Sequence, residues 1–153
     1  MIGNNACALC SQSLEPILAE GEHWRLVLNR NQDLLGKCFL ALRRHCEAVT
    51  DLTSQEWAEL HAQLRVTTEA LWQTFCPDRF NYAFLQNQDR HVHLHVIPRY
   101  ATPRVLAGEM FPDAGYPDHY AVGHPARVVP VEAVEEIVEK LRQAVMEAQV
   151  REA

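Results

Sequence analysis

Residues 91–100 read HVHLHVIPRY and begin with a histidine at every second position. Alternate side chains of a β-strand face the same side of the sheet. The segment therefore predicts a strand with His91, His93 and His95 on one face. The alternating apolar residues take the other face and supply core: Val92, Leu94 and Val96. The three imidazoles are expected to look out onto a surface or a cleft.

Three interpretations of this row of imidazoles can be weighed, and the first two are structural and metal-binding. The first is a half-exposed strand whose polar positions happen to be histidine, an unusual use of a side chain that titrates near neutrality. The second is a metal site, but His91 and His95 would lie roughly 13 Å apart, so one zinc ion takes at most two adjacent members. A zinc hydrolase with His91 and His93 as ligands and an open coordination position stays an alternative.

The third interpretation is nucleophilic catalysis. Neutral imidazole is a nucleophile near pH 7 and can form a covalent phosphoryl intermediate. Imidazoles beside it can donate hydrogen bonds to phosphate oxygens as negative charge develops there. This chemistry needs a central nucleophile with neighbours on the same face, and the spacing makes His93 that residue.

A second group of reactive side chains lies near the N-terminus, where Cys7 and Cys10 form a C-x-x-C pair. Alone, such a pair indicates either a metal site or a redox motif. The chain has five cysteines, an odd number that fits poorly with a disulfide framework and favours a reducing, cytoplasmic compartment. Cys38, Cys46 and Cys76 are expected to be spectators.

Length and charge limit the function further. The 153 residues are enough for one domain with a substantial core. A net charge of −6 argues against a nucleic-acid partner bound through a basic face. Neither a signal peptide nor a membrane span is evident, so we expect a cytoplasmic protein without a membrane partner.

The elements that position these residues can be read from periodicity and caps. Thr53 and Glu56 form a capping-box signature ahead of a long helical pattern that ends before Pro77. Pro130 is placed as the first residue of a final helix. Residues 98–130 show no periodicity and predict a long ordered loop. Strands are predicted at 17–20, 24–29, 37–43, 82–85 and 92–97.

These elements sum to an α+β domain, a mostly antiparallel sheet of about five strands with two helices. We expect a single domain over residues 1–153. Its parts are a core at about 7–100, a long loop at 101–129 and a C-terminal helix at 130–150.

The motif HVHLHVIPR resembles the His-φ-His-φ-His-φ-φ signature of the histidine triad (HIT) family, continued by a Pro-Arg common among its members. Upstream, LVLNRNQDLLGKCFLALRRH resembles the strand–turn–strand segment of that family. The long helix, the NYAFLQN strand and the triad then follow in the family's order. The resemblance covers roughly residues 7–100 and implies a HIT-like fold and a homodimer; residues 101–129 have no counterpart.

Members of this family cleave or transfer nucleoside monophosphates from phosphoramidates or dinucleoside polyphosphates, without an organic cofactor. The resemblance implies that His93 attacks the α-phosphorus of a nucleotide substrate to give a nucleotidyl-histidine, as in diadenosine polyphosphate hydrolases. It makes His95 a phosphate-positioning neighbour whose protonation state matters. His91 completes the triad. The alternative is a nucleotide-binding regulatory protein with weak catalysis.

The family's binding residues carry over in part. Asn29 lies where members bind the ribose hydroxyls, although asparagine also favours a turn there. Gln86 or Asn87 falls near a polar residue that contacts phosphate. Lys37 replaces a histidine that many members carry, and is either a point charge for phosphate or a solvated strand-end lysine. This departure motivates the regulatory alternative. Arg99 either meets a phosphate or lies on the surface.

The resemblance also implies a metal site. Some members and their uridylyltransferase relatives bind zinc through a cysteine pair, a histidine after the second strand and the first triad histidine. The corresponding residues are Cys7, Cys10, His45 and His91. They form a closed tetrahedral Cys₂His₂ set, which predicts a structural zinc ion.

Overall fold

The computed structural model describes residues 7–11, 14–121 and 126–153. The main strands are β1 (Ile17–Glu20), β2 (Trp24–Leu28), β3 (Cys38–Leu42), β4 (Arg79–Ala83) and β5 (His93–Arg99). The helices are α1 (Ser54–Phe75) and α2 (Val131–Glu152), with short 3₁₀ turns η2 (Ala8–Cys10) and η3 (Val49–Asp51). Two further strands, β6 (Arg104–Leu106) and β7 (Glu109–Phe111), pair with each other.

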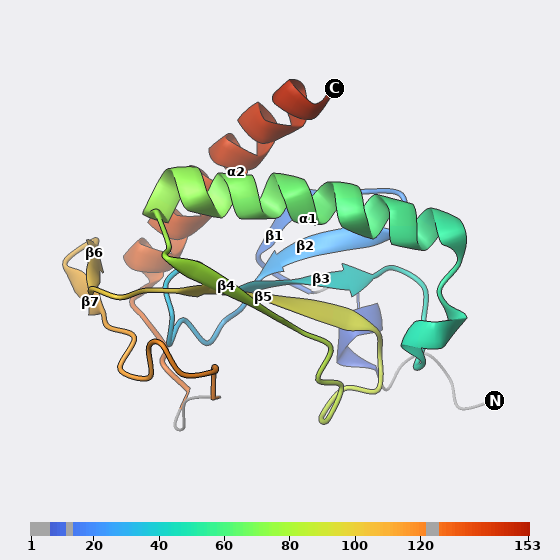
Figure 1. Cartoon of the computed structure of the whole chain (residues 1–153), viewed down its shortest axis with the longest axis horizontal. Helices are drawn as coiled ribbons and strands as arrows, with labels where there is room; N and C mark the ends of the chain where they lie inside the picture. The colour runs from blue at the N-terminus through green and yellow to red at the C-terminus, as the bar shows by residue number, and fades with distance from the viewer. Residues whose placement is uncertain (1–6, 12–13, 122–125) are drawn as a thin grey trace.

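The described residues build a five-stranded antiparallel sheet in the order β1-β2-β3-β5-β4. Figure 1 shows α1 above this sheet and α2 rising behind it from the lower left to the top. The blue turn η2 and the segment after β7 (residues 112–121) lie below the sheet. The core lies between the sheet and the helices and includes Leu40, Leu71 and Leu141. The predicted α+β class, with its antiparallel sheet and two helices, is confirmed. Neither helix is long and apolar enough to cross a membrane.

Strand β5 follows the predicted alternation. Val92, Leu94 and Val96 are buried in the core, as expected for the apolar face of the strand. Its neighbour β3 places Phe39 opposite His95, so these two side chains lie on the sheet face away from the helices. That face is the one available for chemistry.

The start of α1 depends on local hydrogen bonds that the sequence predicts. The Thr53 hydroxyl accepts from the backbone N–H of Glu56, and the Glu56 carboxylate accepts from the N–H of Thr53. The helix ends at Phe75, before a left-handed Cys76. Pro130 caps α2 rather than opening it, a difference of one residue.

Two strands differ from their predicted limits by more than one residue at an end, because pairing with a neighbouring strand sets those limits. β4 runs from Arg79 to Ala83 rather than over 82–85, since its residues pair with β5 from Arg99 back to His95. β5 continues through Pro98 to Arg99, past the predicted end at 97. Pro98 lies past Val96, the last residue of β5 that pairs with β3, and its strand partner is Phe80 of β4. Proline is tolerated there as it is on an edge strand.

The region predicted as a loop contains a hairpin. β6 and β7 pair around Ala107 and Gly108, which have φ values of 49° and 77°. Two positive φ values in succession are typical of a type I′ turn, which normally carries Asn-Gly. Alanine rarely adopts this conformation, so composition did not indicate the turn.

Candidate active site

The helix-free face of the sheet carries a cleft of about 560 Å³. Six residues singled out from the sequence line it: Asn29, Lys37, Gln86, Asn87, His93 and His95. Its apolar wall includes Val27 and Phe39. Two other predicted site residues, His91 and Arg99, do not line the cleft.

The ring of His93 is held in a defined tautomer by the main chain. Its Nδ1 lies 2.6 Å from the carbonyl oxygen of His91. A carbonyl can only accept, so Nδ1 carries the proton and Nε2 of the neutral ring carries the lone pair. His95 presents its own Nε2 at 3.1 Å and donates to that lone pair in this arrangement. The ring nitrogen with a lone pair available to a ligand is therefore Nε2 of His93.

His95 is an uncharged neighbour at neutral pH. Burial, followed by the charges of His93 and Lys37, lowers the pKa of His95 to about 4. At pH 7 it is a neutral hydrogen-bond donor rather than a cation. A phosphate bound beside it would raise this pKa, because the imidazolium form would then gain an opposite charge.

Lys37 is buried, with 3% of its surface exposed, so the interpretation as a solvated strand-end lysine is wrong. Its ammonium pairs with the Asp33 carboxylate at 2.6 Å and donates to the Tyr120 hydroxyl at 2.7 Å. Burial lowers the pKa of Lys37, while Asp33 opposes this effect. Tyr120, which also lines the cleft, was missed because only the folding of a distant segment brings it there.

The polar residues at the rim have structural contacts as well. The Asn29 side-chain oxygen accepts from the N–H of Asn31 at 2.9 Å, so the turn role of Asn29 is present. Gln86 has a φ of 49° and donates its amide to the Glu47 carbonyl at 2.8 Å. Both residues still line the cleft, together with Asn87.

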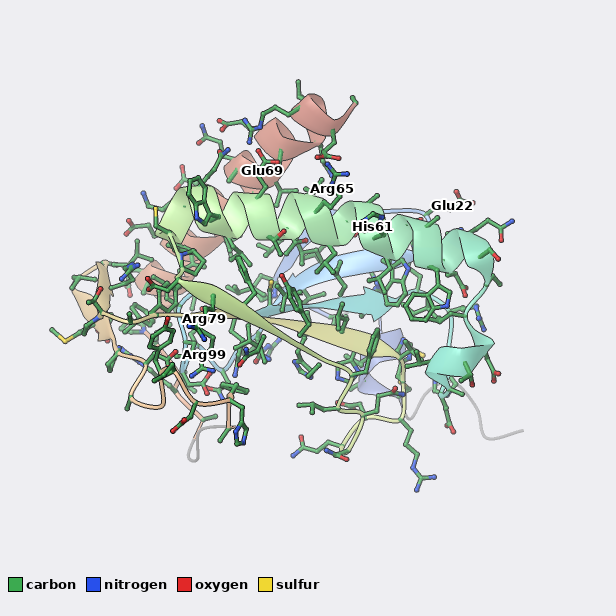
Figure 2. The ribbon with its side chains drawn as sticks, viewed as in Figure 1. Glu22, His61, Arg65, Glu69, Arg79 and Arg99 are labelled. Atoms are coloured by element: carbon green, nitrogen blue, oxygen red, sulfur yellow. The ribbon has the colours of Figure 1, made fainter. Side chains whose placement is uncertain are left out.

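Arg99 lies neither on the surface nor in the cleft. Its guanidinium pairs with the Asp113 carboxylate, and the two side chains are 3% and 4% exposed. It also donates to the side-chain oxygen of Asn81 and the carbonyl of Asp118, each at 2.7 Å. In Figure 2, Arg99 lies beside Arg79, where the segment after β7 passes the sheet. Arg99 therefore holds that segment in place.

The four predicted zinc ligands converge. One ligand atom from each of Cys7, Cys10, His45 and His91 lies within 4.8 Å of the others. His91 Nδ1 is 3.4 Å from both sulfurs, and His45 Nδ1 is 3.3 Å from that of Cys10. The prediction that His91 looks out onto a surface or cleft is wrong, because its ring is fully buried against this cluster.

The cluster has the donor chemistry and support of a zinc site. His91 Nε2 donates to the Leu42 carbonyl at 2.7 Å, which directs Nδ1 at the sulfurs. His45 Nε2 faces the Glu47 carboxylate at 3.4 Å. Burial and the neighbouring Cys7 raise the pKa of Cys10 to about 11, so the thiol is protonated unless a cation binds. His93 lies outside this group, which argues against a zinc ion shared by His91 and His93.

Comparisons with known proteins identify the fold that carries this site. No family model and no curated protein matches the sequence. Solved structures do match. A histidine triad protein from Bradyrhizobium japonicum superimposes with a TM-score of 0.71 at 18% identity, covering 95% of this chain and 97% of that one. A hypothetical histidine triad nucleotide-binding protein from Sulfolobus tokodaii gives 0.69 at 19%, over 92% and 93%.

A zinc-bound histidine triad family protein from Mycobacterium smegmatis has a TM-score of 0.67 at 20% identity, covering 97% of this chain and 99% of that one. The chain thus has the histidine triad fold over nearly its whole length. The resemblance recognised in HVHLHVIPR is confirmed at the level of the fold.

Proposed function

We propose that this protein is a histidine triad nucleotide hydrolase or nucleotidyl transferase that uses His93 as its nucleophile. The observation that carries the proposal is the fixed tautomer of His93, whose Nε2 lone pair lies beside His95 and in the same cleft as Lys37. The histidine triad fold supports it, as does the nucleotide-binding description of the Sulfolobus tokodaii protein.

The proposed reaction begins with attack of His93 Nε2 on the α-phosphorus of a nucleoside phosphoramidate or dinucleoside polyphosphate. The nitrogen lone pair forms the N–P bond, and the leaving group departs with the electrons of its own bond to phosphorus. The ring becomes cationic, and the carbonyl of His91 stabilises it by accepting from Nδ1. Water or another acceptor then attacks the phosphorus, and the N–P bond breaks with its electron pair returning to Nε2 of His93. The acceptor loses its proton to solvent, so the nucleotide product is released and the neutral imidazole is restored.

The remaining cleft residues would bind and orient the nucleotide. His95 would donate Nε2–H to a phosphoryl oxygen once substrate separates it from His93. Asn29 would contact the ribose hydroxyls, and Gln86 or Asn87 the phosphates. The apolar wall with Val27 and Phe39 suits a planar base.

We also propose that Cys7, Cys10, His45 and His91 hold a structural zinc ion. Two thiolates and two imidazoles satisfy its tetrahedral preference, and no site is left open for water. The ion would cross-link the N-terminal segment to the residue two positions before the nucleophile. The Mycobacterium smegmatis structure, which contains zinc, supports this assignment.

A cytoplasmic homodimer completes the proposal. β4 is an edge strand of the sheet, and an unpaired edge can accept a strand from a second copy. Large apolar side chains are exposed on α1 and on β4 itself, including Trp72 and Tyr82. Light scattering of the purified protein would test the dimer.

The proposed chemistry can be tested by intact-protein mass after brief mixing with a panel of nucleotidyl donors and quenching without acid. We expect a nucleotidyl adduct on the wild type and none on His93→Ala. His61→Ala is the matched control, because His61 is exposed on the outer side of α1 (Figure 2) and should leave the adduct intact. An adduct that persists in His93→Ala would refute the assignment. Nucleotide binding without adduct or product would favour the regulatory alternative.

A further inference from the structure

The segment after β7 is fastened to the sheet at the edge of the cleft. Asp113 accepts from Arg99 at 2.7 and 3.1 Å, and also from the N–H of Tyr100 at 3.1 Å. Further along, the side-chain oxygen of Asn81 accepts from both Arg99 and the N–H of Tyr120. These contacts fix the backbone of Tyr120 against β4 and β5.

Fixing that backbone delivers the Tyr120 hydroxyl to a charged pair. The hydroxyl donates to the Asp33 carboxylate at 2.7 Å and accepts from the Lys37 ammonium at 2.7 Å. Lys37 and Asp33 pair directly at 2.6 Å. The three residues come from a turn, the entry to β3 and a segment more than eighty positions away, so only the folded chain assembles them.

Of the three residues Asp33, Lys37 and Tyr120, the positively charged one faces the cleft. Lys37 and Tyr120 line the cleft with His93 and His95, whereas Asp33 is not among the lining residues. Lys37 lies two residues before Phe39, the partner of His95 in the β3–β5 register, and therefore on the same sheet face. An ammonium has three N–H donors, and Asp33 and Tyr120 engage two of them within the described part of the chain.

We propose that Tyr120, supported by Asp33, is a positioning residue that holds the Lys37 ammonium as the phosphate-binding cation of the cleft. This inference rests on the proposed nucleotide chemistry and assigns a role to the segment after β7. Lys37 would touch a phosphate oxygen with its remaining donor. A lysine has four rotatable side-chain bonds, so the hydroxyl and carboxylate remove freedom that the phosphate would otherwise have to remove on binding.

The test separates phosphate recognition from binding of the nucleoside. Dissociation constants are measured by calorimetry for AMP, GMP, CMP and UMP, each paired with its nucleoside, and the tightest pair is used. The dissociation constant of the nucleoside divided by that of the nucleotide gives the contribution of the phosphate to affinity. The variants are Lys37→Met, Tyr120→Phe and, as matched control, Tyr116→Phe, which removes a hydroxyl from the same segment outside the cleft.

We expect Lys37→Met to lower this ratio at least about tenfold, as for loss of a hydrogen bond to a charged group. Tyr120→Phe should lower it by about fivefold while nucleoside affinity stays constant, and Tyr116→Phe should not change it. If Tyr120→Phe left the ratio unchanged, or lowered the affinities for nucleoside and nucleotide equally, the inference about Tyr120 would be overturned while the proposed function would stand. A wild type that binds no nucleotide would overturn the proposed function as well.

Discussion

Replacing Asp113 with alanine should strongly destabilise the protein, because it would leave a buried positive charge without its counter-ion. The side chains of Arg99 and Asp113 are 3% and 4% exposed. The carboxylate accepts from two guanidinium nitrogens and from the N–H of Tyr100. After substitution, the acceptors left to the guanidinium among the described residues would be the oxygens of Asn81 and Asp118.

The magnitude follows from the cost of an unpaired charge in the interior. Removing one partner of a buried ion pair typically costs about 3–5 kcal/mol, since the desolvation of the remaining ion is no longer offset. We expect about 4 kcal/mol for Asp113→Ala, a large part of the stability of an ordinary domain. Replacing both partners with apolar residues, as in Arg99→Met with Asp113→Leu, should cost less than the single change.

Urea unfolding followed by circular dichroism would measure the free energy of unfolding of each variant. Asp118→Ala is the control, because Asp118 contacts Arg99 only through its backbone carbonyl and its side chain is exposed. That control should stay within about 0.5 kcal/mol of the wild type. If Asp113→Ala lost less than about 1 kcal/mol, the charge would not be buried in the sense argued from the structure.

Three further predictions concern pH, metal and backbone. Folding lowers the pKa of His95 from 6.5 to about 4, so the neutral ring favours the folded state fully above about pH 6.5, and this contribution to stability is lost as the pH falls toward 4. Between pH 7 and 5, the free energy of unfolding of His95→Asn should therefore fall by about 2 kcal/mol less than that of the wild type in urea titrations. Equal decreases in the two proteins would contradict the burial argument. Chelation of a zinc-loaded protein should lower the melting temperature yet leave adduct formation at His93 below that temperature, whereas immediate loss of the adduct would indicate a chemical role for the metal. Gly36→Ala should lower the free energy of unfolding by about 3 kcal/mol, because φ is 81° and the new Cβ would lie 2.9 Å from Leu71. Gly108→Ala is the control: its φ is 77° but the space around it is open, so the loss should be about 1 kcal/mol. Similar losses in the two variants would show that Leu71 moves away and relieves the contact.

Features that depend on neighbours in the chain could be predicted from the sequence. The burial of Val92, Leu94 and Val96 and the Thr53–Glu56 capping box follow from local patterns with a direct geometric meaning, and both appear in the structure. The limits of β4 could not be predicted, because they depend on its partner β5 rather than on local composition. The Ala107–Gly108 turn escaped notice because alanine seldom takes a positive φ.

The same distinction applies to the candidate site. Family order along the chain brought six cleft residues and the four cluster residues into the prediction. The burial of Lys37 and Arg99 was not predictable, since Tyr120 and Asp113 reach them from a region that carries no recognisable sequence motif. The match to solved histidine triad structures nevertheless extends over nearly the whole chain. A charged residue in a sequence carries no sign of the distant partner that will bury it.

Position 91 serves two neighbours through different parts of one residue. Its imidazole belongs to the cysteine cluster, while its main-chain oxygen fixes the proton of His93. Every amino acid has that oxygen, so the acceptor is independent of which side chain occupies the position. Replacing the side chain at position 91 would therefore remove a ligand of the proposed metal site but would keep the tautomer of His93, provided that the backbone of the strand did not move. The proposed zinc binding and the proposed covalent chemistry thus depend on different parts of residue 91, the side chain and the main-chain oxygen.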